Sequence, residues 1–254
     1  HMRCRYCHNP ETWKEEGGTL ETAQEVFDKA YRYRNYWKNG GGITVSGGEA
    51  LLQMEFVTEL FEIAKKNDIP RLREIWKVCF GDPDSYLDFY FANGFPLFKT
   101  VVDRTDGEIT SMLTVVPAFY QKDGECFDAA YLYAVGTAPE WRGKGIASRL
   151  LAEIHELLRK DGIKAAMLFP AEDSLYRFYE KLGYRGGFSV HEVRLKREDC
   201  TPAACIVDDC EKDLFLEKSA DFLRLRPVAM KFTAKSLGYF YDEVLATQGQ
   251  VLWI

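Results

Sequence analysis

Residues 131–148 read YLYAVGTAPEWRGKGIAS and predict a strand that enters a glycine-rich turn and then a helix. Apolar residues recur after the turn at the spacing of one helix face, and these are Ile146, Leu150, Leu151, Ile154, Leu157 and Leu158. Gly162 then stands where the C-cap of such a helix belongs. The stretch therefore predicts a strand, turn and helix unit within an α/β fold.

The chemistry of this turn favours an anion. Free backbone N–H groups at a helix start, with the helix dipole behind them, attract negative charge, and glycines let a pyrophosphate approach the main chain. Arg142 and Lys144 strengthen this interpretation, because cations at a helix start oppose the dipole and call for an anion nearby. The alternative is a helix that begins with glycine and lysine by chance, since short glycine patterns are common.

A second block, residues 169–184, reads FPAEDSLYRFYEKLGY and ends in the pattern Tyr-x-x-x-Gly-aromatic from Tyr179 to Tyr184. The turn itself matches R/Q-x-x-G-x-G/A through Arg142, Gly145 and Ala147. With both blocks, residues 60–195 resemble the GNAT family of N-acetyltransferases. This resemblance implies an acyl-CoA N-acyltransferase fold of the α/β class, in which helices flank a mixed, mostly antiparallel sheet.

The resemblance also implies acetyl-CoA as the cofactor. Pyrophosphate would lie on the backbone of residues 143–148, and pantetheine and thioester would lie along residues 135–137. The implied cofactor-binding residues are Val135, Gly136, Thr137, Arg142, Gly143, Lys144, Gly145, Ile146, Ala147, Ser148 and Ser174. The sequence departs from the family at Glu172, where an asparagine is usual.

Acetyl transfer to an amine needs donors for the oxyanion and an acid for the departing thiolate, and backbone N–H groups around Val135 can serve the oxyanion. Tyr179 is the predicted acid, because a phenol can donate to a thiolate whose acid has a pKa of about 8.5. A core tyrosine is the alternative interpretation. For the general base, Glu108, Asp128 and water all stay open. The expected acceptor is a primary amine on a small molecule or a peptide.

The first part of the chain has a different pattern, with CRYCHNP at residues 4–10 and GGITVSGGE at residues 41–49. Residues 3–67 resemble a fragment of the pyruvate formate-lyase activating enzymes, which are radical-SAM enzymes. There, three cysteines in a C-x3-C-x2-C pattern bind a [4Fe-4S] cluster, and only Cys4 and Cys7 match. Thr22 and Glu25 predict a capping box at the start of a helix. We expect two strand-to-helix units, a βα fragment of the family's barrel.

The predicted organisation is a radical-SAM-like segment at 1–60, the acetyltransferase domain at 61–195 and an extension at 196–254 that resembles the opening of a second GNAT-like half. Asp68 and Pro70 predict the start of the first acetyltransferase helix. Residues 61–64 suit either a strand or a helix. Further helices are expected near 84–93, 173–182, 211–223 and 232–245, and strands near 98–104, 108–119, 125–137, 165–169 and 250–254.

Composition narrows the function further. The net charge of −6 argues against nucleic acid as the main partner, and no apolar run is long enough for a membrane span. Seven unevenly spaced cysteines suit reduced thiols in a cytoplasmic protein, and no spacing marks a metal site. A homo-oligomer stays open. The alternatives to an acetyltransferase are a fragment of a radical-SAM activase of glycyl-radical enzymes and a catalytically silent CoA-binding fusion protein.

Overall fold

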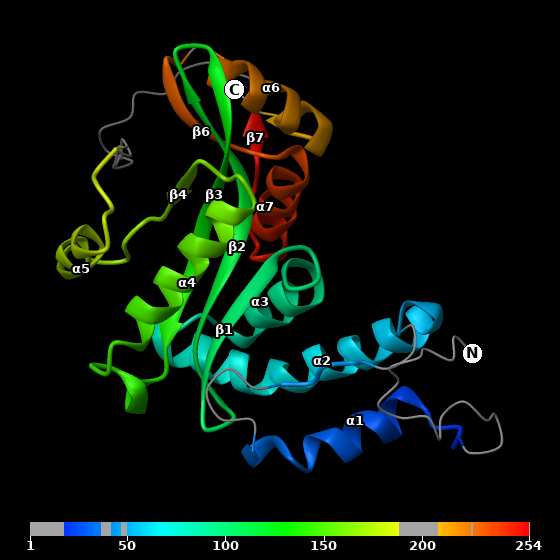
Figure 1. Ribbon diagram of the computed structural model, residues 1–254. Coiled ribbons are helices and arrows are strands. Elements are labelled where there is room, and N and C mark those ends of the chain that lie inside the picture. Colours follow the sequence, from blue (N-terminus) through cyan, green and yellow to red (C-terminus); the bar gives the residue numbers. More distant parts are fainter. Residues whose placement is uncertain (1–17, 37–41, 47–49, 188–207, 225, 254) are drawn as a thin grey trace. The chain divides into compact units, whose positions relative to one another are not determined.

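The computed structural model describes residues 18–36, 42–46, 50–187, 208–224 and 226–253 (Figure 1). The chain divides into two compact units. Unit 1 comprises residues 1–75 and 103–110, and unit 2 comprises residues 76–102 and 111–254. Helix α2 (Met54–Phe80) and strands β1 (Lys99–Thr105) and β2 (Glu108–Lys122) each have residues in both units. The predicted domain limits at 60 and 195 stay predictions.

Unit 1 begins with helix α1 (Ala23–Tyr31), which is followed by the short helical turns η3 (Arg34–Tyr36) and η4 (Ala50–Gln53). Its capping box is confirmed, because the Glu25 N–H donates to Thr22 Oγ1 at 3.2 Å and the Thr22 N–H donates to a carboxylate oxygen of Glu25 at 2.8 Å. Phe27 of α1 and Leu60 of α2 lie in a small apolar core. That core joins the N-terminal segment to α2.

Two expectations for this part of the chain were wrong. Residues 42–46 form no strand, although Ile43 and Val45 pack against the small core. A strand needs a hydrogen-bonded neighbour, and the described residues of unit 1 pair none with this segment. The helix predicted to start at Asp68 is instead the second half of α2, which contains Pro70 and includes residues 61–64. Proline removes one N–H donor, and the apolar residues on both sides of Pro70 keep the helix packed.

The sheet confirms the mixed, mostly antiparallel α/β class. Its strand order is β1, β2, β3 (Glu125–Thr137) and β4 (Ala165–Met167), and β6 (Val228–Phe232) also pairs with β2. The β2–β3 and β2–β6 pairs are antiparallel, whereas β3 and β4 are parallel. Asp106 and Gly107 both have positive φ in the predicted hairpin turn between β1 and β2, as a type I′ turn requires.

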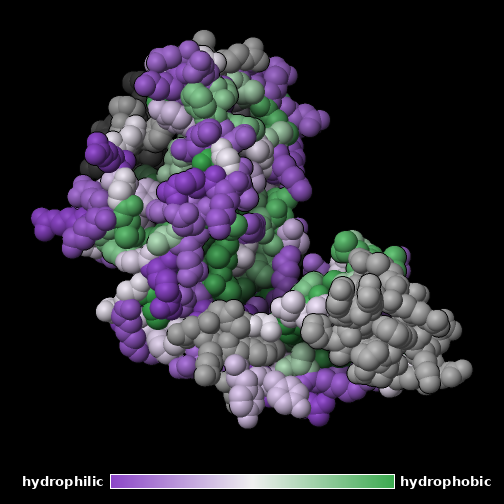
Figure 2. Space-filling view, viewed as in Figure 1, coloured by the Kyte–Doolittle hydropathy of each residue, from purple (hydrophilic) through white to green (hydrophobic). Residues whose placement is uncertain are grey.

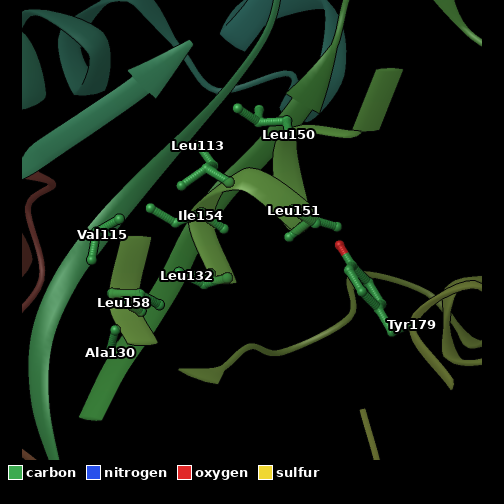
Figure 3. Close-up of a cluster of buried hydrophobic side chains, with 9 residues drawn as sticks. All are labelled: Leu113, Val115, Ala130, Leu132, Leu150, Leu151, Ile154, Leu158 and Tyr179. Carbon is green, nitrogen blue, oxygen red and sulfur yellow. The ribbon is translucent and has the colours of Figure 1, made fainter. Parts of the chain in front are cut away.

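Helices cover both faces of the sheet in unit 2. Helix α4 (Ile146–Lys160) packs on one face, where its leucines meet apolar side chains of β2 and β3 (Figure 3). Helix α3 (Asp84–Phe89) with the π-helical turn η5 (Tyr90–Gly94), and helix α7 (Ala234–Ala246), contact one another on the other face. Gly162, with φ of 78°, ends α4 in a Schellman arrangement, as its sequence position predicted.

The remaining elements are short or lie in the C-terminal part. They are η6 (Pro139–Trp141), η7 (Asp173–Leu175), α5 (Tyr176–Lys181), β5 (Asp208–Asp209), α6 (Lys212–Arg224) and β7 (Leu252–Trp253). Strand β5 pairs with β7, and β6 has no counterpart among the predicted strands. None of the helices in the described ranges is both long enough and apolar enough to cross a membrane. Much of the visible surface is hydrophilic, with smaller hydrophobic areas between (Figure 2).

Candidate functional site

A β-bulge interrupts strand β3 within the predicted cofactor segment. Met112 pairs with Gly136 and Thr114 pairs with Tyr133, so that Ala134 and Val135 together oppose a single residue of β2. Ala134 has φ of 51°, a left-handed conformation that is rare for a residue with a side chain. A β-bulge generally leaves a main-chain group outside the ladder, where it can bind another polar group.

The bulge also changes which face each side chain of β3 occupies. Ala130 and Leu132 belong to the core under α4, and so does Val135, which lies three positions after Leu132 rather than two or four. Gly136 lies instead against α2, where an added Cβ would meet Cys79 Sγ at 3.3 Å. Because an added Cβ could fit only if the Cys79 side chain shifted, the packing favours glycine at this position.

Strand β4 pairs with only the first half of β3. The parallel pairs run from Ala129 with Ala165 to Tyr131 with Met167, where β4 ends. The bulge begins three residues further along β3. Residues 132–137 therefore have no strand partner on the β4 side among the described residues. An extended ligand could pair with this edge as a strand would.

The glycine-rich turn leads into α4 without a cap. Gly143 and Gly145 both have φ of 75°, and a Cβ added at either would meet no atom within 4 Å. Gly145 is the N-cap residue, no side chain caps the helix, and its first turn contains no acidic residue. Four backbone N–H groups at a helix start lack partners within the helix. The turn thus offers exposed main chain and an uncompensated dipole to an anion, and this fits a pyrophosphate.

Arg142 makes contacts that the sequence did not indicate. Its Nε donates to the Thr137 carbonyl oxygen at 3.1 Å, and its Nη2 lies 3.4 Å from Cys79 Sγ. The Cys79 thiol donates to the same carbonyl oxygen at 3.4 Å. Lys144 Nζ lies 4.3 Å from the centre of the Trp141 ring. Both cations therefore have protein partners, and an anion is not needed to explain either one.

Further polar contacts hold the end of β3. The Ser111 hydroxyl donates to the Gly136 carbonyl oxygen at 2.7 Å and lies 3.0 Å from Thr137 Oγ1. Neither Ser111 nor Cys79 was singled out from the sequence, because each lies outside the motif in an ordinary stretch. The predicted residues of the turn and of β3 thus come together at one end of β3. Ser174 is exposed and lies in η7, outside the strand, turn and helix unit.

Tyr179, the predicted acid, lies in α5 and is 8% exposed. It packs in the apolar core under α4, and its hydroxyl points toward Leu151 (Figure 3). No hydrogen bond joins this hydroxyl to another residue that the structure describes. Burial raises the pKa of Tyr179 above its ordinary value, so the phenol stays protonated at neutral pH.

Of the predicted bases, Asp128 is exposed and lies six residues before Ala134 on β3, roughly 20 Å away along the strand. Glu108 is exposed at the start of β2. Cys4, Cys7 and residues 47–49 lie outside the described residues, as do Cys200 and Cys205. Among the described residues, no group of histidine, cysteine and acidic side chains could hold a metal ion.

The comparison with protein-family models identifies the family. The model of the acetyltransferase (GNAT) domain matches residues 61–187. The chain belongs to the GNAT family. A second model, that of the radical SAM superfamily, matches residues 1–96. The two matches overlap from residue 61 to residue 96. Both models therefore match most of α2 and all of α3.

Curated relatives match the N-terminal part. The pyruvate formate-lyase-activating enzyme of Streptococcus mutans is 46% identical over 91 residues, which cover 35% of this chain and 35% of that enzyme. The enzyme of Listeria monocytogenes is 46% identical over 88 residues, which cover 34% of this chain and 36% of that enzyme. The chain thus matches about a third of the length of these relatives.

Among solved structures, a GCN5-related N-acetyltransferase from Anabaena variabilis is 28% identical in sequence to this chain over the aligned residues. The alignment covers 44% of this chain and 29% of that one, with a TM-score of 0.37.

Proposed function

We propose that unit 2 transfers an acetyl group from acetyl-CoA to a primary amine. The observation that carries this proposal is the bulge at Ala134, which lies on the strand that leads into an uncapped, glycine-rich helix start. Pyrophosphate would bind the backbone of residues 143–148, and pantetheine would pair with the free edge of residues 135–137. The thioester oxygen would accept hydrogen bonds from backbone N–H groups at the bulge.

We propose that Tyr179 interacts with the sulfur atom of CoA. A phenol whose pKa is raised by burial gives up its proton less readily than the thiol of CoA does. Its role is therefore to donate a hydrogen bond that stabilises the departing thiolate. The acceptor is proposed to be a small-molecule or peptide amine.

Calorimetry with acetyl-CoA and with CoA tests the proposal. We expect saturable binding of both, and release of a free thiol when an amine acceptor is added. Absence of binding at millimolar acetyl-CoA would contradict the assignment. Binding without thiol release over a broad panel of amines would favour the catalytically silent CoA-binding protein.

The match of residues 1–96 to the radical SAM superfamily motivates a second candidate, a fragment of a glycyl-radical activase. Such a function needs a [4Fe-4S] cluster bound by cysteine thiolates. Anaerobic reconstitution with iron and sulfide should leave the protein colourless if acetyl transfer is its function. A brown protein with cluster absorption would support the activase.

A further inference from the structure

A chain of hydrogen-bonded side chains lies on the α3 and α7 face of the sheet in unit 2. The hydroxyls of Tyr133 on β3 and Tyr86 on α3 are 2.6 Å apart. The Tyr86 hydroxyl donates to Oε1 of Glu243 on α7, also at 2.6 Å. Tyr239 donates a longer bond of 3.4 Å to the same oxygen. A chain of hydrogen bonds thus runs from β3 through α3 to one carboxylate on α7, which Tyr239 also contacts.

The direction of these bonds is fixed by counting protons. A tyrosine hydroxyl has one proton, and that of Tyr86 is used on Glu243. Tyr133 must therefore donate its own proton to Tyr86. The Tyr133 oxygen retains a lone pair for an outside donor. The chain is consequently polarised from Tyr133 toward Glu243, as the transfer of a proton to the carboxylate requires.

The charge environment suits a proton acceptor. Burial raises the pKa of Glu243, nearby Asp82 raises it further, and the hydrogen bonds from Tyr86 and Tyr239 oppose the shift. No lysine, arginine or histidine among the described residues pairs with this carboxylate. Burial also raises the pKa values of Tyr86, Tyr133 and Tyr239, so these phenols stay protonated at neutral pH.

The position of Tyr133 links the chain to the candidate site. Tyr133 directly precedes Ala134, where the bulge begins, and its side chain is only partly buried. Its ring lies on the face opposite α4, 5.6 Å from the centre of the Trp76 ring. Tyr86, by contrast, is buried at 9% exposure. Tyr133 is thus the end of the chain beside the bulge, and Glu243, which is also only partly buried, is the end on α7.

We propose that Tyr133, Tyr86 and Glu243 form a relay that takes a proton from the ammonium group of the acceptor. This inference rests on the proposed function. The ammonium group gives a proton to Tyr133 as Tyr133 gives its own to Tyr86, and Tyr86 gives its own to Glu243. The neutral nitrogen then forms the C–N bond to the acetyl carbon. The C–S bond breaks, its electron pair leaves with sulfur, and the resulting thiolate takes the second proton of the nitrogen to become the thiol of CoA.

The relay defines the class of acceptor. An alkyl primary amine, like the side chain of lysine with a pKa of about 10.4, arrives charged and must lose a proton before it can attack. An aromatic amine is already neutral at pH 7 and needs no such step. Glu243 acts through the two tyrosines and is therefore a positioning and proton-storing residue. The alkyl amine is the substrate that depends on it.

The test compares Glu243→Gln with the intact chain on both kinds of acceptor. Glutamine can still accept the bond from Tyr86, but it cannot store a proton. We expect kcat/KM for an alkyl amine at pH 7 to fall by about a hundredfold. The value for an aromatic amine and the Kd of acetyl-CoA should stay within twofold. The rise of kcat/KM with pH that follows ionisation of Glu243 should disappear.

Asp242→Asn is the matched control, because it removes the same charge from the adjacent residue, which pairs with Lys212. It should keep kcat/KM within twofold for both amines. Tyr86→Phe interrupts the relay and preserves the ring, so it should reproduce the selective loss. Equal losses for both amines, or less than a twofold loss for the alkyl amine, would overturn the relay alone. Failure of the intact chain to bind acetyl-CoA would overturn the proposed function and the relay together.

Discussion

Arg142 belongs to the proposed cofactor motif and also has a structural role within the protein. Its guanidinium group bonds the carbonyl oxygen of Thr137 and lies beside the Cys79 thiol, and this ties the turn to the end of β3. From the sequence alone, a cation at a helix start suggests an anion. The structure supplies a second reason for the same residue, so replacing Arg142 would disturb both the turn and the binding of phosphate.

Tyr179 was predicted to be catalytic, but its burial alone could be explained by a role in the core. Its ring packs against the ring of Phe178 at 5.1 Å and that of Tyr184 at 5.6 Å. A phenylalanine would make the same contacts. The hydroxyl is the part that packing does not explain, since it bonds none of the described residues.

Tyr179→Phe is therefore expected to separate function from stability. We expect kcat to fall by about a hundredfold, because the departing thiolate loses its hydrogen-bond donor. The KM for acetyl-CoA should be unchanged, and the free energy of unfolding should change by less than about 1 kcal/mol. Steady-state thiol release and thermal unfolding measure both quantities.

Tyr184→Phe is the control for this variant. The Tyr184 hydroxyl lies 2.7 Å from Nε2 of His155, so its removal should cost stability and leave kcat near its original value. Equal kcat in Tyr179→Phe and the intact chain would show that Tyr179 belongs to the core alone.

At the scale of elements, a negative side chain at the start of α4 should stabilise the helix but weaken the binding of acetyl-CoA. Ser148 is the third helical residue after Gly145, in the turn where N–H groups lack internal partners. A negative side chain there stabilises a helix, whereas a negative side chain beside a pyrophosphate repels it.

Ser148→Glu should weaken the binding of acetyl-CoA at least tenfold and leave unfolding unchanged or raise its free energy by roughly 0.5 kcal/mol. Calorimetry and thermal unfolding of the same sample give both values. Ser148→Gln has a similar size without the charge and should lose less affinity. An unchanged Kd in Ser148→Glu would mean that no pyrophosphate binds at this helix start.

Many elements of the acetyltransferase part of the chain could be predicted from local patterns. A short sequence pattern is enough to predict each of three features. These are the apolar period of α4, its end at Gly162 and the Asp106–Gly107 turn. Strand β6 could not be predicted, because it is short and its partner β2 lies about a hundred residues earlier in the chain. A strand of five residues is too short to show a clear alternation of apolar and polar side chains, and no neighbouring residue marks its partner.

The candidate site divides in the same way. The glycine-rich turn is visible in the sequence because positive φ requires particular residues. The bulge is not, because Ala134 is an ordinary residue that its surroundings force into a left-handed conformation. Glu243 lies more than a hundred residues from Tyr133 and forms no motif with it. Only the packing of α7 against α3 brings the two together.

For the whole molecule, the two family matches meet in α2. This helix includes Leu60, in the small core with Phe27, and Trp76, which packs against Tyr90 with ring centres 4.3 Å apart. The first contact belongs to unit 1 and the second to unit 2. Different parts of α2 thus pack in the core of each unit.

The proposed cofactor residues and the relay all belong to unit 2, whereas α1 belongs to unit 1. Deleting residues 3–54 should therefore keep the Kd of acetyl-CoA within a few-fold. It should also uncover Leu60 and the neighbouring apolar side chains of α2, which are covered by Phe27 in the intact chain. Exposed apolar faces associate, so we expect lower stability or a larger oligomer, measured by light scattering beside calorimetry.

Phe27→Ala in the full-length chain separates loss of this core from loss of the segment. Removing a buried phenylalanine costs about 3 to 5 kcal/mol, so unit 1 should unfold at a lower temperature while acetyl-CoA still binds. If the deletion variant remained folded and soluble but no longer bound acetyl-CoA, the N-terminal segment would be part of the site. Retained affinity in both variants would mean that the radical-SAM-like sequence contributes packing rather than chemistry to acetyl transfer, because it stabilises α2 without touching the cofactor.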